Sequence, residues 1–327
     1  MTPAGEHCGM NYEDQKKHES KFLSLTSLTV VEFEYLLGYF EPLWEKHYRY
    51  HTLQGGPGKH PAFREHGNSL LKGTAQKLFF LLVYLKNNPL QTFQAASFGI
   101  SQPKVWAITR CLLSVLDEAL GRLGLLPSRD SCELARLLTG HRSRVFWLDG
   151  VEAGVQRNAD QDAQKQEFSG KKRGHRLKNL TLCDAWQTIL SPTESGRMHD
   201  RALAELYPIE LPAGSTLKQD LGFLGHAPAG VCIEQPFKKP KGDQLTHGQK
   251  IYNTILSSTR VVIEHANSGI KRLRMLRDTI RIHDSQIRDQ VRVLACGMHN
   301  LRVQAVDPER LYQASSRAQA YEINISK

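Results

Sequence analysis

The chain has 327 residues, with 43 lysines and arginines against 33 aspartates and glutamates, which gives a net charge of +10. This length indicates two structural units, because domains usually contain about 100–200 residues. The excess of positive charge favours an anionic partner, most simply nucleic acid.

The cysteines and apolar runs bear on the compartment. Six cysteines are scattered without close pairs, so neither a disulfide framework nor a zinc module is indicated, and reduced thiols are expected. The first residues lack the apolar core of a signal peptide, and the longest apolar run, "LFFLLVYL" at 78–85, is too short to span a bilayer. We therefore expect a soluble cytoplasmic protein with no membrane partner.

The first part of the chain has helical periodicity. Residues 1–25 are polar and are expected to form a disordered lead. Residues 28–51, "LTVVEFEYLLGYFEPLWEKHYRYH", carry apolar side chains at helical spacing, and residues 69–87 form a second helical pattern that stops near Pro89. We assign residues 26–135 to a helical domain.

Residues 92–116, "TFQAASFGISQPKVWAITRCLLSVL", resemble a helix-turn-helix within about residues 90–115. Ala95 is small where two helices would cross, Gly99 permits a tight turn, and Val105 would pack a helix of residues 101–113 back on the first. The second helix of such a motif can enter the major groove of DNA. A plain helical hairpin is the alternative. The candidate DNA contacts are Lys104, Thr109 and Arg110.

From about residue 136 the pattern indicates an α/β unit that continues to residue 327. "RSRVFWLDG" predicts a strand ended by Asp149, and "STLKQDLGF" predicts another ended by Asp220. Residues 176–195 predict a hairpin that turns at 185–187, followed by a helix with Asp200 as its N-cap. Strands that alternate with helices in this way are typical of a layered α/β domain.

Three acidic residues are candidates for one site. Asp149 and Asp220 end strands, and Glu264 is the single acid in "RVVIEHANSGIKRLR". Turn formation explains either aspartate alone, and a solvated pair with Arg260 one turn earlier explains Glu264. However, strand ends and a helix packed across them meet at one edge of a sheet. Carboxylate oxygens at such a point suit Mg²⁺ or Mn²⁺.

Residues 169–178, "SGKKRGHRLK", concentrate positive charge. This density favours a surface that follows a phosphate backbone, although a solvated face that only aids solubility is the alternative. The basic candidates for DNA binding here are Lys171, Lys172, Arg173, Arg176 and Lys178.

Five stretches occur in the order seen in one known family: "LDGVEAGVQR", "FSGKKRGHRLKN", "SGRMHD", "LKQDLGFLG" and "NTILSSTRVVIEHANSGIKRLRML". From about residue 30 to residue 302 the chain resembles DDE-superfamily transposases, specifically the insertion-sequence-five group. The resemblance implies an α/β fold, in which an RNase H-like mixed sheet flanked by helices follows an all-α helix-turn-helix domain.

The resemblance also implies the residues of the site. Asp149, Asp220 and Glu264 would be the catalytic and metal-binding triad, holding two Mg²⁺ ions for which Mn²⁺ can substitute. Arg260 and Lys271 would contact phosphate. The tyrosine that many relatives carry before the arginine, with two residues between them, is replaced by Ser257.

The function implied is a transposase that cleaves DNA at the terminal inverted repeats of an insertion sequence and joins the 3′-hydroxyl ends to target DNA. It would be nucleoid-associated and form a homodimer or higher oligomer on two DNA ends. Two alternatives stay open. One is a domesticated DNA-binding protein that no longer transposes, and the other is an RNase H-like nuclease that acts on RNA or RNA–DNA hybrids.

Overall fold

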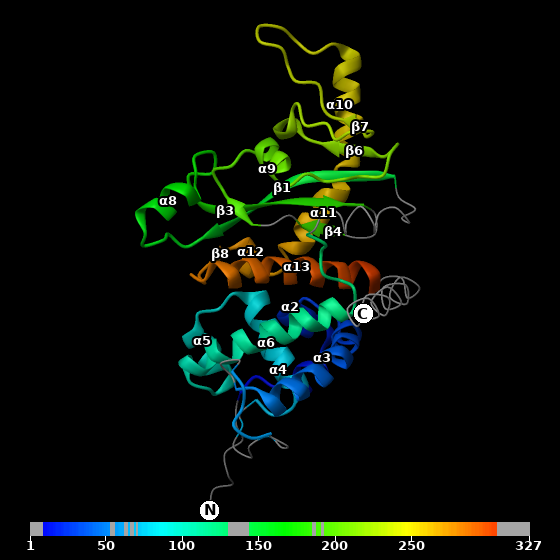
Figure 1. Ribbon diagram of the computed structural model, residues 1–327. Coiled ribbons are helices and arrows are strands. Elements are labelled where there is room, and N and C mark those ends of the chain that lie inside the picture. The colour runs from blue at the N-terminus through cyan, green and yellow to red at the C-terminus, as the bar shows by residue number, and fades with distance from the viewer. Residues whose placement is uncertain are drawn as a thin grey trace, which may run out of the picture. The chain divides into compact units, whose positions relative to one another are not determined.

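The computed structural model describes residues 9–52, 56–61, 65, 69, 71–129, 144–184, 188–190 and 193–305. They form two compact units, one up to Leu126 with Arg272–Met275 and the described residues from Gln304, the other Pro127–Lys271 with Leu276–Val303 (Figure 1). The expected domain boundary at 135/136 lies outside the described residues. Within the described part of the chain, no helix is both long and apolar enough to cross a membrane.

The first unit is helical. Its helices are α1 (Tyr12–Gln15), α2 (Glu19–Thr26), α3 (Val30–Tyr50), α4 (Thr74–Asn87), α5 (Gln91–Phe98) and α6 (Gln102–Arg122). The helices predicted at 28–51 and 69–87 correspond to α3 and α4. The expected disorder of residues 1–25 is wrong from residue 12 onward, because α1 and α2 form there. Tyr12 and Phe22 are buried, and the Tyr12 ring stacks on Phe33 with centroids 4.9 Å apart.

The predicted helix-turn-helix corresponds to α5 and α6. Helix α5 ends at Gly99, whose φ of +69° lies in the left-handed region that glycine adopts without strain. Ser101 is the N-cap of α6, but its side chain makes no capping hydrogen bond. Ala95 and Val105 are buried where the two helices pack, as expected. Helix α6 continues to Arg122, beyond the predicted end at residue 113.

The second unit contains a mixed sheet. Its strands are β1 (Val145–Val155), β2 (Phe168–Ser169), β3 (Gly174–Cys183), β4 (Thr188–Leu190), β5 (Glu194–Ser195), β6 (Thr216–Gln219), β7 (Cys232–Glu234) and β8 (Thr279–Ile280). Strand β3 pairs antiparallel with both β1 and β4, whereas β6 pairs parallel with both β1 and β7. This arrangement confirms the predicted RNase H-like mixed sheet. The expected turn at 185–187 lies outside the described residues.

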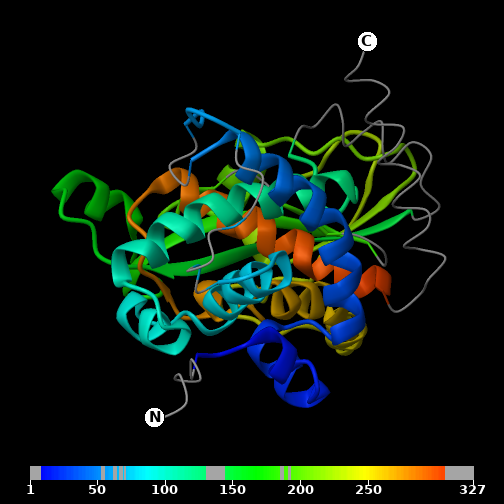
Figure 2. The ribbon, with the colours of Figure 1, turned by 90° about the horizontal axis from the view of Figure 1, so that it is seen from below.

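Helices cover both faces of this sheet. The helices of this unit are α8 (Gln161–Glu167), α9 (Asp200–Leu206), α10 (His247–Thr259), α11 (Val261–Ile270) and α13 (Ser285–Ala305), with the 3₁₀ turn η1 (Leu221–Phe223). Helix α12 (Arg274–Arg277) spans the division between the units in the sequence. Figure 1 shows α9 on one side of the sheet and α11 and α13 on the other, and in Figure 2 α13, in orange to red, lies across the direction of the strands.

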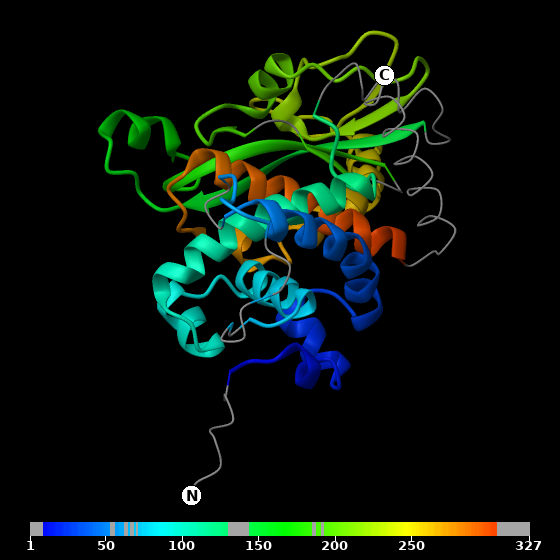
Figure 3. The same ribbon diagram turned by 60° about the horizontal axis from the view of Figure 1, so that its bottom comes forward.

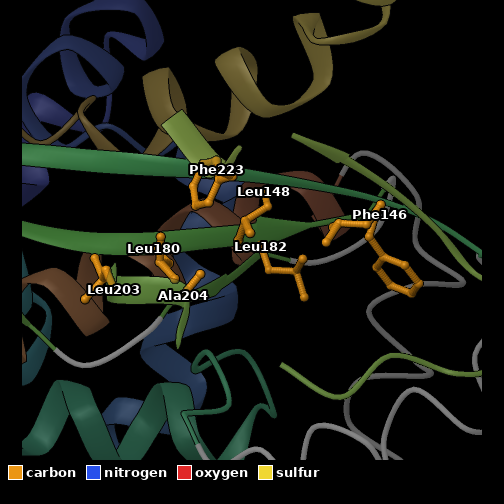
Figure 4. Close-up of a cluster of buried hydrophobic side chains, with 8 residues drawn as sticks. Phe146, Leu148, Leu180, Leu182, Leu203, Ala204 and Phe223 are labelled. Atoms are coloured by element: carbon orange, nitrogen blue, oxygen red, sulfur yellow. The ribbon is translucent and has the colours of Figure 1, made fainter. Parts of the chain in front are cut away.

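The core under α9 is a cluster of apolar side chains from both layers (Figure 4). Its buried members are Phe146, Leu148, Leu180, Leu182, Leu203, Ala204, Leu217 and Phe223. On the opposite face, Ile263 and Ala266 of α11 pack with Cys183 and the partly buried Trp147. Alternate side chains in the N-terminal half of β1 therefore point to opposite faces of the sheet, so that one set packs against α9 and the other against α11.

Candidate active site

Asp149 and Asp220 are neighbours across two parallel strands. The last paired residues of β1 and β6 are Leu148 and Gln219, and each aspartate follows one of them. Because adjacent strands lie about 4.8 Å apart, this register places the two aspartates side by side. The structure thus brings together two of the three acids that the sequence analysis singled out.

Strand β1 is longer than predicted, and Asp149 lies inside it rather than at its end. Phe146 and Leu148, at even positions of the strand, are buried on the α9 side. After Asp149 and Gly150 the buried residues are at odd positions, beginning with Val151 and Ala153. The pairing of β1 with β3 continues through this change without interruption. The covered side therefore switches at Asp149, and the sequence pattern resembles a strand end although the strand continues to Val155.

The Asp149 carboxylate faces α11. Asn267 donates a hydrogen bond of 2.8 Å from Nδ2 to Asp149 Oδ2, and Arg260 Nη2 lies 3.7 Å from Oδ1. Burial raises the pKa of Asp149 to about 6; Arg260 opposes this increase, whereas the negative charges of Asp220 and Asp200 add to it. The site therefore disfavours an ionised Asp149 when no cation is present.

Asp220 is fixed at the end of β6. It is the N-cap of η1, where its Oδ1 accepts a hydrogen bond of 2.8 Å from the backbone N–H of Gly222. Gln235 donates from Nε2 to the backbone oxygen of Asp220 at 2.6 Å. The strand therefore ends at an acid and a glycine, as the sequence predicted.

Glu264 lies on α11 and is exposed. Within the described part of the chain, no group of three or more His, Cys, Asp or Glu side chains is close enough to hold a metal ion. Glu264 nevertheless shares a helix stripe with Arg260 and Asn267, because spacings of four and three residues return to the same face. Both of those residues lie against Asp149, so Glu264 belongs to the helix stripe that faces Asp149.

Asp200 approaches the site from the other face of the sheet. A Cβ placed on Gly150 would overlap Asp200 Oδ1, and a Cβ on Gly222 would lie 2.8 Å from Asp200 Oδ2 and 2.9 Å from Asp220 Oδ1. The glycines after both aspartates thus make room for Asp200. The predicted N-cap role of Asp200 is wrong, because His199 occupies the N-cap and Asp200 is the first residue of α9.

Lys178 is also placed differently from the expectation. It is buried, with Nζ 3.0 Å from Asp200 Oδ1 and 3.4 Å from Glu152 Oε1, and it donates to the backbone oxygen of Met198 at 3.0 Å. A buried, paired ammonium group is not a surface contact for phosphate, so this part of the DNA-binding prediction is wrong. Glu152 and Asn267 were not predicted as site residues from the sequence, because only the register of β1 against β3 and the helix spacing of α11 indicate their positions.

The remaining candidate DNA contacts differ in how far their side chains are exposed to solvent. Lys104 and Arg110 are exposed on α6, but Thr109 is buried and its hydroxyl donates to the backbone oxygen of Val105 at 2.7 Å. Thr109 therefore does not face a partner, and its predicted DNA contact is wrong. The exposed side chains of the turn before β3 are Lys171, Lys172 and Arg173.

Two further cations lie nearer the acids. Arg176 is partly buried, with Nε 3.9 Å from Glu152 Oε2. Burial lowers the pKa of Lys271, and the charges of Asp149 and Glu152 oppose that decrease. Together with Arg260, Lys271 makes the α11 side of the aspartate pair cationic.

A mixed sheet that presents adjacent aspartates, in a chain with a separate helix-turn-helix, is consistent with a nuclease-like class of protein. Residues 148–300 match the family described as DDE superfamily endonuclease, and residues 71–122 match the helix-turn-helix of DDE superfamily endonuclease. The chain thus resembles DDE-superfamily endonucleases with an N-terminal helix-turn-helix. Its placement in the insertion-sequence-five group stays a prediction.

Among curated proteins, the chain is similar to a probable transposase for insertion sequence element IS702 from Microchaete diplosiphon. The two are 32% identical over 136 residues, which make up 41% of this chain and 49% of the relative. The match therefore spans about half the length of that relative. No solved structure matches the chain.

Proposed function

We propose that the chain is a DNA transposase that cleaves at the terminal inverted repeats of an insertion sequence and joins the 3′-hydroxyl ends to target DNA. The observation that carries this proposal is the side-by-side placement of Asp149 and Asp220 at the end of the parallel β1–β6 pairing. The family matches and the similarity to a probable transposase support the same chemistry.

The aspartate pair fits a divalent cation. Two carboxylates from adjacent strands offer the hard oxygen ligands that Mg²⁺ and Mn²⁺ prefer, and the pKa of Asp149 is raised in part by the charge of Asp220, a repulsion that a cation would relieve. Endonucleases of this superfamily generally use divalent metal ions. We assign Asp149 and Asp220 as ligands, and Glu264 as the third, for two Mg²⁺ ions. When bound, such ions activate a water or a 3′-hydroxyl and stabilise the leaving oxygen.

The protein's own side chains then position the DNA strand. Asn267 holds one oxygen of Asp149 and so orients the carboxylate. Arg260 and Lys271 place positive charge beside the aspartates, where a phosphodiester would lie. Arg260 can bind a phosphate with a forked pair of donors, whereas Lys271 acts as a point charge.

DNA recognition is divided between the two units. Helix α6 would enter the major groove with Lys104 and Arg110, and the turn that carries Lys171, Lys172 and Arg173 would contact phosphates. Joining two element ends requires two copies of the site, so we propose a homodimer or higher oligomer on DNA. A protein that acts on a bacterial insertion sequence works in the cytoplasm, on the nucleoid.

Strand cleavage tests the proposal. The probes are labelled duplexes from the DNA that flanks the coding sequence, incubated with Mg²⁺, Mn²⁺ or EDTA. Asp149→Asn, Asp220→Asn and Glu264→Gln should each abolish cleavage while binding is retained. Asp243→Asn, which alters an exposed loop carboxylate, is the matched control and should cleave normally.

The rivals give different results in the same assay. Binding of the flanking duplex without metal-dependent cleavage by the unaltered chain would indicate a domesticated DNA-binding protein. Preferential cleavage of RNA–DNA hybrids would indicate an RNase H-like nuclease. If Glu264→Gln alone left cleavage intact, the third ligand would have to be another acid, and Asp200, which approaches Gly150 and Gly222 beside the pair, is the next candidate.

A further inference from the structure

A depression of about 870 Å³ is lined by residues of α8, of the β2–β3 hairpin and of the neighbouring loops. Figure 3 shows α8 at one extremity of the second unit. The volume of the depression is within the range of about 300–1,000 Å³ that is usual for ligand sites. It is separate from the aspartate pair. The residues that line it are Arg157, Ala159, Gln161, Gln164, Lys165, Phe168, Gly170, His175 and Arg197.

The lining is cationic. Arg157, Lys165 and Arg197 are exposed, and no acidic side chain is among the described residues that line the depression. Lys165 pairs with Asp162 of α8 at 3.2 Å, so the two arginines carry most of the positive charge that faces solvent. Gln164 accepts a hydrogen bond of 2.8 Å from Nε of Arg157 and donates one of 2.6 Å to the backbone oxygen of Asn158. This anchor fixes the guanidinium group by its inner nitrogen and leaves its two outer nitrogens available for an anion.

An aromatic side chain lies among these cations. Phe168 is 44% exposed, and its ring meets the His175 ring edge to face, with centroids 5.7 Å apart and planes at 68°. Nδ1 of His175 is buried without a hydrogen-bond partner among the described residues. An exposed aromatic ring beside cations is the chemistry that binds a nucleobase and its phosphates, since every base can stack on an aromatic face.

We propose that this depression binds an unpaired nucleotide of the DNA substrate, with the base against Phe168 and the flanking phosphates on Arg157 and Arg197. This inference rests on the proposed DNA-processing function. The turn that carries Lys171, Lys172 and Arg173 directly follows Gly170 of the lining, so the phosphate-binding surface continues from the depression along the chain.

The strand register gives the distance from the aspartates. Asp149 pairs with Thr181 of β3, and His175 lies six residues before Thr181 on the same strand, which corresponds to about 20 Å. That length matches about six base pairs of a duplex. The depression therefore holds a nucleotide that is well outside the cleaved phosphodiester, on the same piece of DNA.

The test compares two probes in EDTA, so that cleavage plays no part. One is a 20-base-pair fluorescent duplex, and the other is the same duplex with a single unpaired 2-aminopurine. The full chain should bind the second probe about tenfold more tightly. Phe168→Ala should remove this preference and leave the affinity for the perfect duplex unchanged, whereas Phe168→Trp should retain it.

Phe237→Ala is the matched control. Phe237 is 46% exposed and meets Tyr252 edge to face at 5.2 Å, but it does not line the depression. It should keep the preference for the unpaired nucleotide. The inference is overturned if the unaltered chain binds both probes equally, if Phe168→Ala keeps the preference, or if an RNA probe of the same sequence binds more tightly. Loss of cleavage in Asp149→Asn without change in these affinities would separate this site from the catalytic one.

Discussion

Lys178 Nζ lies 3.0 Å from Asp200 Oδ1, and this pair joins two separate stretches of the sequence. The lysine belongs to the basic segment that begins β3, and the aspartate ends "SGRMHD" and is the first residue of α9. Glu152 of β1 is the second acid within 3.4 Å of Lys178. The lysine thus links β1, β3 and α9 close to the aspartate pair. A buried ammonium group of this kind and its acidic partners depend on one another, because removing one of them leaves an uncompensated buried charge.

Replacing Lys178 should therefore affect folding before DNA affinity. Lys178→Met leaves the carboxylates of Glu152 and Asp200 without their cation, and the free energy of unfolding should fall by about 3 kcal/mol. Urea unfolding followed by circular dichroism measures this change. Lys172→Met, at an exposed position of the same segment, is the control and should stay within about 0.5 kcal/mol. A Lys178→Met protein of unchanged stability would show that the bridge contributes little.

Gly150 should resist substitution because of Asp200. A Cβ at residue 150 would overlap Asp200 Oδ1, so Gly150→Ala should lower the free energy of unfolding by about 1–3 kcal/mol. The decrease should be smaller when Asp200→Ala is already present, which a double-mutant cycle measures. Gly170→Ala is the control, since nothing lies within 4 Å of its added carbon. Additive effects of the two substitutions would contradict this steric conflict.

Much of the fold could be predicted from local patterns. Helical periodicity identified α3 and α4. Gly99 marked the turn between α5 and α6, because glycine has no side chain and adopts the left-handed backbone conformation of a helix end without strain. The acid and glycine after β6 likewise marked a real strand end at Asp220. These features depend on residues near one another in the sequence, and such features are visible in a single sequence.

The rest depended on contacts between distant segments. Helices α1 and α2 form because Tyr12 and Phe22 are buried against other helices, although their own segment is polar. The continuation of β1 past Asp149 depends on which helix covers each face. Lys178 resembled its basic neighbours in sequence, yet its register opposite Glu152 buries it. No local pattern distinguishes these cases.

The ionisation of Asp149 should cost stability at neutral pH when no metal is bound. Its pKa is about 6 in the folded chain against 3.8 as the ordinary value, so the cost is absent below pH 3.8, grows between 3.8 and 6, and is complete above 6. Asp149→Asn should therefore be more stable than the unaltered chain by about 2–3 kcal/mol at pH 8, and the difference should vanish near pH 4.

Urea unfolding in EDTA across this pH range measures the Asp149 effect. Asp243→Asn removes an exposed carboxylate and should leave the curve of stability against pH unchanged. Mg²⁺ should stabilise the unaltered chain at pH 8 more than Asp149→Asn, because a ligand that binds the folded state adds to its stability. A constant difference between the two proteins from pH 4 to pH 8 would show that burial of this carboxylate is not the cause.

The exposed turn of Lys171, Lys172 and Arg173 should act on all DNA alike, because phosphate contacts carry no sequence information. Neutralising the three residues together should lower affinity for the element end and for scrambled DNA in equal proportion. The slope of log affinity against log salt should decrease by about 0.9 for each phosphate that the protein no longer neutralises. An unchanged slope in fluorescence anisotropy titrations at several salt concentrations would mean that the turn serves only solubility.

Helix α6 should behave in the opposite way. Lys104 and Arg110 are exposed near its start, whereas Val105 and Thr109 are buried and hold the helix to its unit. Arg110→Ala should weaken binding to the inverted repeat by about 1–3 kcal/mol if the guanidinium reads a base, with a much smaller effect on scrambled DNA. Arg122→Ala, at the far end of α6 where Arg122 pairs with Glu118, is the control and should bind both DNAs normally. Equal weakening on both DNAs would mean that Arg110 contacts only phosphate, and the reading of sequence would then have to come from another exposed residue of α6 or from the sheet-containing unit.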